Sequence, residues 1–442
     1  METLFSKSFS FKTFLKFVAP AIVSMIFISL YTIVDGIFVS QLVGSDALAS
    51  INITLPIMNI VFGFGIMMSS GGAAITSIKM GQKDKEGANQ TFSLVCISAI
   101  ISGIIVGILG VLNIESISLF LGATPKLLSY CIDYGHIILL FTPFFISKAL
   151  FEFFIRVDGK FNFSMIITIS GGIINIVLDY IFIKYFNMGI GGAALATGLG
   201  VLIPSIIGLC YFLSAKSGLK FIMPKFNFKE LLGIMANGSS EMVTELSTGI
   251  TTLIFNLLVL KYAGENGLAA LTIILYAHFL LVSTYLGFSM GISPLISYNY
   301  GAQNFDKLKE TFTYSKRFII GSAGLIFAIS MLFTHQLVGV FVSSNSAVYQ
   351  IAFSGLRLFS LCFLFVGINV CTSSMFTAFS NGKLSSIIAF SRSFIFVIIG
   401  FAILPHILDL NGLWLVVPFA ELLTLTLSVF FLNKYKSFYN YG

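Results

Sequence analysis

At 442 residues, with 57% hydrophobic and only 10% charged side chains, the chain lies far outside the range of soluble domains, in which about 25% of residues are charged. Its mean hydropathy is +0.98, which excludes a soluble enzyme and predicts an integral membrane protein. A net charge of +7 could indicate nucleic-acid binding, so the distribution of the basic residues along the chain has to decide that question.

Apolar runs of 20 or more residues recur along the whole sequence, and each is long enough to cross about 30 Å of hydrocarbon. The first run has no small-residue cleavage site, so we expect a membrane span there rather than a cleaved signal peptide. Twelve spans are predicted, near 13–39, 48–76, 91–113, 131–155, 162–183, 189–213, 230–260, 267–297, 312–334, 347–378, 384–405 and 411–432. The predicted fold class is therefore an all-α integral membrane protein with twelve transmembrane helices.

Most of the 25 Lys and Arg residues lie at the two termini or in the even-numbered connections between spans, as Lys79 and Lys83 do. Lys126, Lys184 and Lys261 lie on the opposite side. Cytoplasmic loops carry an excess of Lys and Arg, so both termini are predicted to be cytoplasmic. We expect a multi-pass protein of the bacterial inner membrane, and the basic surplus needs no nucleic acid to explain it.

The stretch from Gly81 to Phe92 has a counterpart 220 positions later, from Gly301 to Phe312. The same offset aligns Gly71 with Gly291 and Ser77 with Ser297. Two copies of one membrane unit are typical of transporters, in which one copy moves against the other. We expect an N-terminal lobe (1–213), a cytoplasmic linker (214–229) and a C-terminal lobe (230–442), with six spans in each lobe.

The cysteines and histidines form no recognisable site. The five cysteines lie in or beside apolar spans without a CxxC pattern, and the four histidines are scattered singly. Neither a disulfide framework nor a zinc site is indicated. We therefore expect no enzyme activity, no cofactor and no metal beyond a coupling Na⁺ or H⁺.

Ionisable side chains inside the spans are costly and mark candidate functional sites. In the N-terminal copy, the predicted topology brings Asp35, Asp179, Asn175, Thr197 and Tyr134 to one depth, in the outer half of the membrane. Asn175 and Asp179 are four residues apart and share a helix face. Oxygen ligands of this kind suit a hard cation or a shared proton. The alternative is that Asn175 and Asp179 join helices structurally.

In the C-terminal copy, Glu241 and Glu245 also share a helix face. Two like charges there are destabilising unless one is protonated or a cation lies between them. They could hold a cationic substrate or form a second proton site. Gly238-Ser239-Ser240 could instead mark a local helix break whose polar residues hydrate the helix.

Other charged residues within the predicted spans have simpler interpretations. Lys148 and Glu152 are four residues apart and are expected to neutralise each other. No role is assigned to Arg357, Arg392 or Glu421, which could pair across helices or extend towards the membrane surface.

The chain resembles the multidrug and toxic compound extrusion (MATE) family over nearly its whole length, and is most similar to the bacterial DinF- or MepA-like branches. Five segments carry the resemblance: Pro20 with Asp35, Gly44-Ser45-Asp46-Ala47-Leu48-Ala49, Arg156-Val157-Asp158-Gly159-Lys160, Asn175-Ile176-Val177-Leu178-Asp179 and Gly189 to Thr197. The resemblance implies two six-helix lobes around a central cavity. It also implies export of amphipathic, often cationic drugs in exchange for Na⁺ or H⁺.

The resemblance further implies which residues bind the coupling cation. The N-lobe cation site of the family matches Asp35, Tyr134, Asn175, Asp179 and Thr197. Some branches carry another carboxylate in the tenth span, whereas 347–378 contains only Arg357 as a charge. The seventh-span acid of those branches is matched by Glu245 or Glu241.

Three classes of function were weighed. A cation-coupled antiporter would export drugs or organic cations across the bilayer as a monomer and contribute to antibiotic resistance. A flippase for lipid-linked saccharides would need a basic cavity, yet the acids Asp35, Asp179, Glu241, Glu245 and Glu421 outnumber Lys148, Arg357 and Arg392. A membrane-embedded enzyme would need clustered reactive side chains, and His406 with Asp409 is too slight a pair. The antiporter is the favoured prediction.

Overall fold

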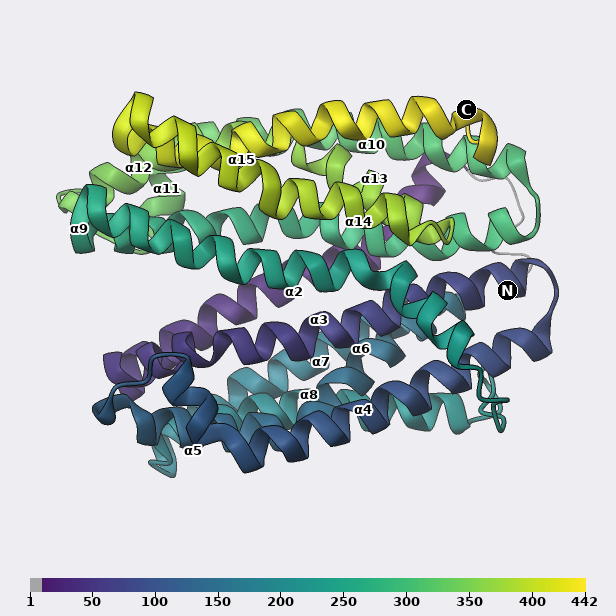
Figure 1. The fold of residues 1–442 in the computed structure, drawn as a ribbon, viewed down its shortest axis with the longest axis horizontal. Helices are drawn as coiled ribbons and strands as arrows, with labels where there is room; N and C mark the ends of the chain where they lie inside the picture. Colours follow the sequence, from purple (N-terminus) through teal and green to yellow (C-terminus); the bar gives the residue numbers. More distant parts are fainter. Residues whose placement is uncertain (1–9) are drawn as a thin grey trace.

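The structure is a computed structural model that describes residues 10–442, and these residues form helices joined by short turns. Two groups of helices lie one above the other (Figure 1). The first group contains α2 (Phe11–Phe38), α3 (Ser45–Gly81), α4 (Lys85–Phe120), α5 (Pro125–Leu140), α6 (Thr142–Val157), α7 (Phe161–Asp179) and α8 (Gly189–Leu213). Wide π-helical turns follow α2 at Val39–Val43 and α7 at Tyr180–Tyr185.

The second group begins with α9, after the connection 214–227. Its helices are α9 (Phe228–Gly301), α10 (Phe305–Leu332), α11 (Thr334–Gly339), α12 (Ala347–Phe359), α13 (Val366–Ala378), α14 (Gly382–Phe390) and α15 (Phe396–Tyr439). A 3₁₀ turn at Ser360–Leu364 separates α12 from α13, and a π-helical turn at Ser391–Ile395 separates α14 from α15.

Twelve crossings result when the long helices are divided at their reversals. Within residues 10–442, nine helical segments are long and apolar enough to cross a membrane, and the pair α5–α6, bent by 48°, forms a tenth. At 1.5 Å per residue the 74 residues of α9 would extend about 110 Å. The chain instead reverses at Gly264, and α15 reverses at Asp409, where φ is 61° and 49°. The twelve-helix, two-lobe fold class is confirmed.

The internal repeat extends to the backbone of the turns. Residues with positive φ recur at the 220-residue offset: Gly44 (120°) with Gly264 (61°), Lys83 (64°) with Gln303 (54°), and Gly189 (56°) with Asp409 (49°). Left-handed backbone conformations are rare outside glycine, so three matched pairs do not arise from shared apolar composition. The two lobes are therefore built on one scaffold.

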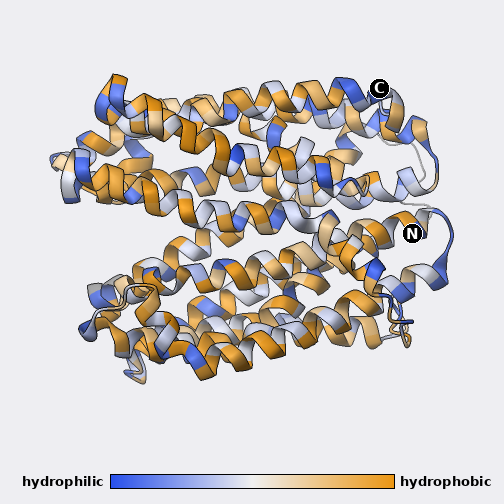
Figure 2. Ribbon diagram, in the orientation of Figure 1, coloured by the Kyte–Doolittle hydropathy of each residue, from blue (hydrophilic) through white to orange (hydrophobic). Residues whose placement is uncertain are grey.

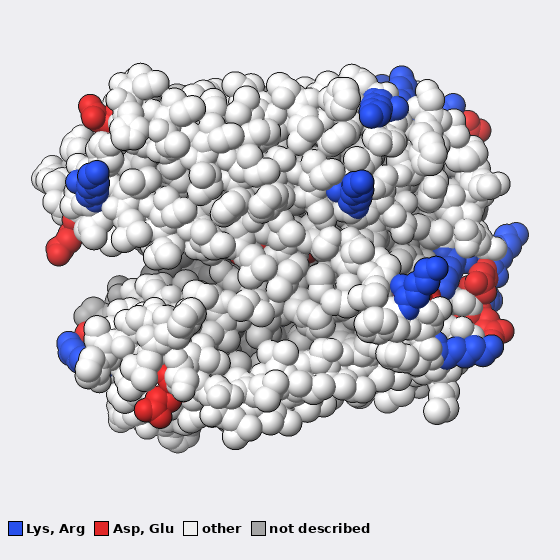
Figure 3. All heavy atoms as spheres, in the orientation of Figure 1, with Lys and Arg blue, Asp and Glu red and all other residues white. Residues whose placement is uncertain are grey.

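The two ends of the molecule differ in charge. Lys and Arg gather at the end where α3 turns into α4, which we call the basic end (Figure 3). At the opposite end a cleft separates the two lobes, and we call this the cleft end (Figure 3). Between the two ends the helices are predominantly hydrophobic (Figure 2), as expected of surfaces that face lipid.

At the basic end the lobes contact each other through glycines. A Cβ on Gly81 would lie 2.1 Å from the carbonyl oxygen of Tyr298, and one on Gly301 would lie 2.1 Å from that of Ile78. These two contacts are related by the 220-residue offset. Only glycine allows backbones to approach so closely. The lobes are thus sealed at the basic end and separated at the cleft end.

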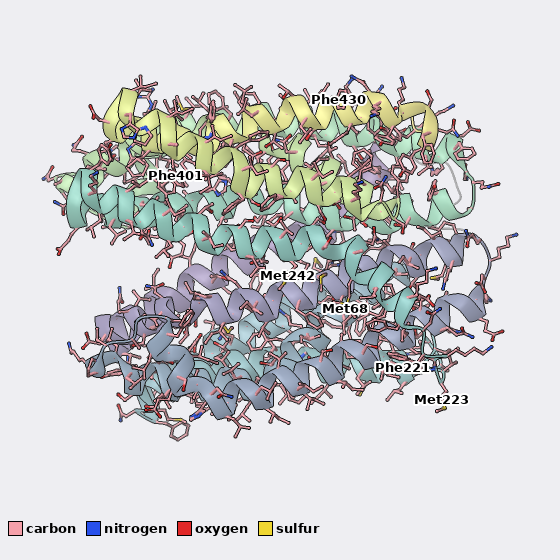
Figure 4. The ribbon with its side chains drawn as sticks, viewed as in Figure 1. Met68, Phe221, Met223, Met242, Phe401 and Phe430 are labelled. Carbon is pink, nitrogen blue, oxygen red and sulfur yellow. The ribbon has the colours of Figure 1, made fainter. Side chains whose placement is uncertain are left out.

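Further polar contacts reinforce this seal. Ser77 Oγ donates to the Pro294 carbonyl at 3.0 Å, and Lys79 Nζ on α3 lies 2.7 Å from Glu230 Oε1 on α9. Met242, labelled in Figure 4 between the two lobes, belongs to the same junction, because its Sδ would lie 2.8 Å from a Cβ on Gly63.

Helix α2 packs on both lobes. Near its start, Phe14 lies 6.0 Å from Phe288 of α9 between ring centroids. Further along, a Cβ on Gly172 of α7 would lie 2.6 Å from Phe27 and 2.8 Å from Tyr31. Helix α2 therefore runs from the C-terminal lobe at the basic end to the N-terminal lobe at the cleft end.

Candidate functional site

Two carboxyl groups meet inside the N-terminal lobe. Asp35, near the end of α2, and Asp179, the last residue of α7, lie close enough for their charges to interact. Asp179 is fully buried. Tyr134 of α5 is also buried and faces both carboxyl groups. Two carboxylates at this separation cannot both keep their charge without a proton or a cation between them.

The amide and the hydroxyl predicted for the same site are joined to each other. Asn175 Nδ2 donates to Thr197 Oγ1 at 3.3 Å, which links α7 to α8. The two helices can approach because a Cβ on Gly171 would lie 2.5 Å from the Gly200 carbonyl oxygen. Asn175 lies one helical turn before Asp179, so the pair extends the carboxyl cluster. The structure thus brings all five predicted side chains together, and their role in cation binding stays a prediction.

The buried oxygens of this cluster lack hydrogen-bond donors. Asp35 Oδ1, Asn175 Oδ1 and both carboxylate oxygens of Asp179 are buried without a partner in the described part of the chain. A buried oxygen without a donor costs about 1–3 kcal/mol, and more if it is charged. A dehydrated Na⁺ or a proton would satisfy these oxygens, because carboxylate, amide and hydroxyl oxygens are ligands of hard cations. The residues present therefore fit a small cation.

Both carboxylates stand next to irregular helix. Asp35 precedes the π-helical turn Val39–Val43 by four residues, and Asp179 directly precedes the turn Tyr180–Tyr185. Wide turns of this kind occur frequently at functional sites, since they break the regular backbone hydrogen bonding. This local irregularity could not be read from the apolar sequence around it.

One residue beside this cluster was not predicted from the sequence. Tyr276, on the second half of α9, comes from the C-terminal lobe, and its hydroxyl would lie 2.9 Å from a Cβ on Gly36. It is near enough to interact with the charge of Asp35. No sequence signal could have found it, since the contact depends on how the two lobes are placed.

The C-terminal lobe holds a different polar network. Arg392 Nη1 lies 3.4 Å from Glu421 Oε1, and Asn369 Nδ2 donates to Glu421 Oε2 at 2.7 Å. Ser428 Oγ in turn donates to Asn369 Oδ1 at 2.9 Å. The sequence left Arg392 and Glu421 without a role, and the structure pairs them across helices.

Glu241 and Glu245 lie at the boundary of this network and the interface between the lobes. Glu241 and Arg392 line a small cavity of about 70 Å³, together with several serines and threonines. Glu245 faces α3, since its Cβ would lie 3.2 Å from a Cβ on Gly63. The two acids are therefore near each other but separate from the Asp35 and Asp179 cluster.

The helix break considered at Gly238-Ser239-Ser240 is not present, because α9 continues through it. Gly238 serves close packing instead: a Cβ there would lie 1.9 Å from the Met67 carbonyl oxygen. Lys148 Nζ and Glu152 Oε1 form the predicted i,i+4 pair at 3.7 Å, which Arg156 joins at 3.8 Å. Arg357 lies over the ring of Phe353 at 5.8 Å.

The residues that could hold a transition metal do not assemble. Within residues 10–442, no three His, Cys, Asp or Glu side chains come together in a way that could hold a metal ion. The oxygen cluster of the N-terminal lobe is thus the candidate cation site that the geometry supports.

Fold and site together define a multi-pass helical membrane protein with two repeated lobes and an intramembrane carboxyl cluster. The MatE family profile matches residues 20–181 and 242–402, one segment in each lobe. The chain therefore belongs to the MatE family of membrane transporters, as the sequence resemblance indicated.

Curated relatives agree with this assignment. The chain is 29% identical over 423 residues to the multidrug export protein MepA of Staphylococcus saprophyticus, covering 93% of this chain and 89% of the relative. It is 27% identical over 420 residues to MepA of Staphylococcus aureus (strain MRSA252), with the same coverage.

Solved structures share the fold. A MATE protein crystallised in complex with MaL6 superposes with a TM-score of 0.92 at 23% identity, covering 98% of this chain and 97% of the other. An outward-facing multidrug resistance transporter of the MATE family also gives 0.92 at 23% identity, covering 100% and 98%. A transporter from Pyrococcus furiosus, described as having a binding pocket of reversed polarity, gives 0.90 at 24% identity, covering 98% and 97%.

Proposed function

We propose that the protein is a secondary active exporter of amphipathic organic cations, driven by antiport of Na⁺ or H⁺ through alternating access. One observation carries the proposal: four buried oxygens of Asp35, Asn175 and Asp179 have no hydrogen-bond donor among the residues that the structure describes. A protein that only needed stability would neutralise such a cluster permanently, with a Lys or an Arg. An exchangeable cation supplies the same neutralisation reversibly.

The coupling cation is a substrate of this cycle. Asp35 and Asp179 supply charge, Asn175 and Thr197 supply neutral oxygens, and Tyr134 closes the buried side. Binding here joins α2, α5, α7 and α8, so the bound and the empty lobe prefer different packing. Coupling then requires only that cation and drug favour opposite states of the two lobes.

The second acidic pair of the molecule supports an organic cation as the exported substrate. Glu241 and Glu245 lie towards the lobe interface, where an amphipathic cation would meet both negative charge and apolar side chains. The curated relatives are named multidrug export proteins. The flippase alternative, which needs a basic lining, is supported less well, because Glu241 and Glu245 outnumber Arg392 there.

The direction of transport follows from the distribution of charge. We place the basic end and both termini in the cytoplasm, in the inner membrane of a bacterium. The cleft then opens to the outside, where the drug leaves and the cation enters. The glycine contacts of Gly81 and Gly301 must separate when the lobes open to the cytoplasm.

Everted membrane vesicles containing the full-length protein test the proposal. A fluorescent organic cation is loaded under an imposed Na⁺ gradient or an imposed proton gradient, each alone. We expect transport with one of the two gradients, which identifies the coupling ion, and expect Asp35→Asn and Asp179→Asn to abolish it. Asp133→Asn is the matched control, because Asp133 is an exposed acid on α5.

Coupled transport that survives in both variants would sink the assignment of the cation site. Movement of a lipid-linked saccharide without any movement of organic cations would replace the exporter by a flippase. A loss of transport in Asp133→Asn equal to that in Asp179→Asn would show that the site variants act through non-specific damage.

A further inference from the structure

A cavity of about 300 Å³ lies in the C-terminal lobe near the basic end. It runs between α10 and α15, with α9 and α13 as its floor. We call it the α10–α15 crevice. Its side towards the lipid is formed by Ile320 and Val429, which are 56% and 43% exposed. The crevice therefore opens sideways, in the direction from which bilayer lipid arrives.

The equivalent space in the N-terminal lobe is filled by aromatic rings. Phe92 lies 4.7 Å from Phe212 and 4.7 Å from Phe221 of the connection between the lobes, and Phe151 lies 5.7 Å from Phe212. Figure 4 shows Phe221 against the N-terminal lobe. These rings stand at positions that correspond to positions lining the crevice.

The C-terminal copy keeps only part of this ring cluster. At the 220-residue offset Phe92 and Phe221 correspond to Phe312 and Tyr441, whose ring centroids are 4.8 Å apart. Phe151 and Phe212 correspond instead to Cys371 and Leu432, and both of these smaller side chains line the crevice. Two lost rings thus account for the space. Protein interiors are otherwise packed closely, so a retained void of this size calls for an occupant.

The rim of the crevice is basic. Lys316 of α10 and Lys436 of α15 are exposed and line it, and in the described part of the chain neither forms an ion pair with Asp or Glu. Ser315 also lines the crevice, and its hydroxyl is buried without a hydrogen-bond partner. Apolar walls below two lysines fit an amphipathic molecule with an anionic head, and they disfavour the organic cation proposed as the exported substrate.

We propose that the α10–α15 crevice binds an anionic phospholipid, with an acyl chain between α10 and α15 and the phosphate at Lys316 and Lys436. Basic pockets between transmembrane helices are suited to anionic headgroups. The lateral opening gives an acyl chain direct access from the bilayer, which a water-soluble anion lacks. The site is separate from the cation cluster and from Glu241, and it does not depend on the proposed function.

Native mass spectrometry of the purified full-length protein tests the site. The protein is titrated with phosphatidylglycerol and, separately, with phosphatidylcholine of the same acyl chains. We expect preferential retention of phosphatidylglycerol, and a loss on the order of tenfold in its affinity when both lysines are replaced (Lys316→Ala with Lys436→Ala). The control pair Lys309→Ala with Lys434→Ala removes the same charge from exposed lysines of the same two helices outside the crevice.

A second variant tests the acyl-chain part without changing charge. Val429→Trp places a large ring at the mouth of the crevice, next to the exposed Phe430 of α15 (Figure 4). We expect it to reduce phosphatidylglycerol retention as strongly as the loss of both lysines. Ile104→Trp is its control, because Ile104 is a similarly exposed residue of α4, 44% exposed. If the lysine variant fails to fold, Val429→Trp still tests whether the lipid binds in the crevice.

Several outcomes overturn the proposal. Equal retention of phosphatidylcholine would show that the crevice does not select an anionic headgroup. Displacement of the lipid by millimolar inorganic phosphate would indicate a simple anion site. Unchanged retention in Val429→Trp, in protein with a normal elution profile, would place the bound lipid elsewhere on the surface.

Discussion

The N-terminal lobe buries Asp35 and Asp179 side by side, whereas the C-terminal lobe buries Glu421 against Arg392 at 3.4 Å. Among the described residues neither aspartate forms an ion pair with a Lys or an Arg. The two lobes share one scaffold, so this difference is chemical rather than architectural. A carboxylate neutralised by a fixed arginine is suited to hold helices together. Carboxylates without such a partner are suited to exchange a cation.

The largest effects are expected when one acid is removed from each lobe, and these variants test the difference between the lobes most directly. We expect Glu421→Gln to lower the free energy of unfolding by about 3 kcal/mol, because it leaves the partly buried Arg392 charge without its ion-pair partner. Asp179→Asn should abolish coupled transport and leave stability nearly unchanged, since it removes a like-charge contact. Thermal unfolding in detergent and vesicle transport measure the two effects.

The double variant Glu421→Gln with Arg392→Gln is the control, and it should recover most of the lost stability. An Asp179→Asn protein as unstable as Glu421→Gln would contradict the distinction between the two lobes.

The glycine contacts test whether the lobes are symmetric where they touch. Gly81→Ala and Gly301→Ala should each reduce transport by about tenfold, because a Cβ at either place would meet a carbonyl oxygen at 2.1 Å. The two variants should be equivalent. Gly321→Ala should be neutral, since a Cβ there meets nothing within 4 Å.

Opening of the basic end can be followed by the labelling rate of Met80→Cys in a cysteine-free background. We expect faster labelling in both glycine variants. Unequal effects of Gly81→Ala and Gly301→Ala would show that the 220-residue symmetry does not govern this contact.

A smaller effect is expected within the N-terminal cluster. Thr197→Val keeps the side-chain shape and removes the oxygen that accepts from Asn175 at 3.3 Å. A hydrogen bond of this kind contributes about 1 kcal/mol, so the coupling-cation concentration at half-maximal transport should rise about fivefold. Thr168→Val on α7, the helix that carries Asn175, is the matched control, because in the described part of the chain Thr168 bonds only the Ser164 carbonyl. Equal shifts in the two variants would remove Thr197 from the site.

The smallest predicted effect concerns Tyr276, which reaches the cluster from the C-terminal lobe. Tyr276→Phe removes the hydroxyl beside Gly36, and we expect about a twofold change in the same half-maximal concentration. Tyr262→Phe, also on α9, loses a hydroxyl that donates to the Pro405 carbonyl and should be silent. If Tyr276→Phe leaves the half-maximal cation concentration unchanged, the site is confined to the N-terminal lobe.

The repeat and the spans could be predicted from the sequence because both depend on local sequence patterns. Apolar runs give the crossings, and Gly44 and Gly264 give matched turns. The break between Leu140 and Thr142 stands directly before Pro143, which cannot continue a regular helix. The 3₁₀ turn at Ser360–Leu364 was not predicted. It interrupts an apolar stretch whose composition does not change, so the packing of neighbouring helices decides it.

Part of the candidate site could likewise be predicted from the sequence, and part could not. The gathering of Asp35, Asp179 and Asn175 could be predicted, since depth in the membrane follows from topology and spacing. The partner of Glu421 could not, because pairing between distant helices depends on their rotation. Gly238 was read as a possible break, yet the close approach of Met67 is what requires it.

The packing of α2 on both lobes has a consequence for biogenesis. Phe14 rests on Phe288, which the ribosome adds 274 residues later. At about 5–20 residues per second, that delay is roughly 15 to 55 s. During this time the first half of α2 lacks its partner, and the N-terminal lobe cannot reach its final packing. Insertion into the membrane must therefore keep the earliest helix available until the second repeat emerges.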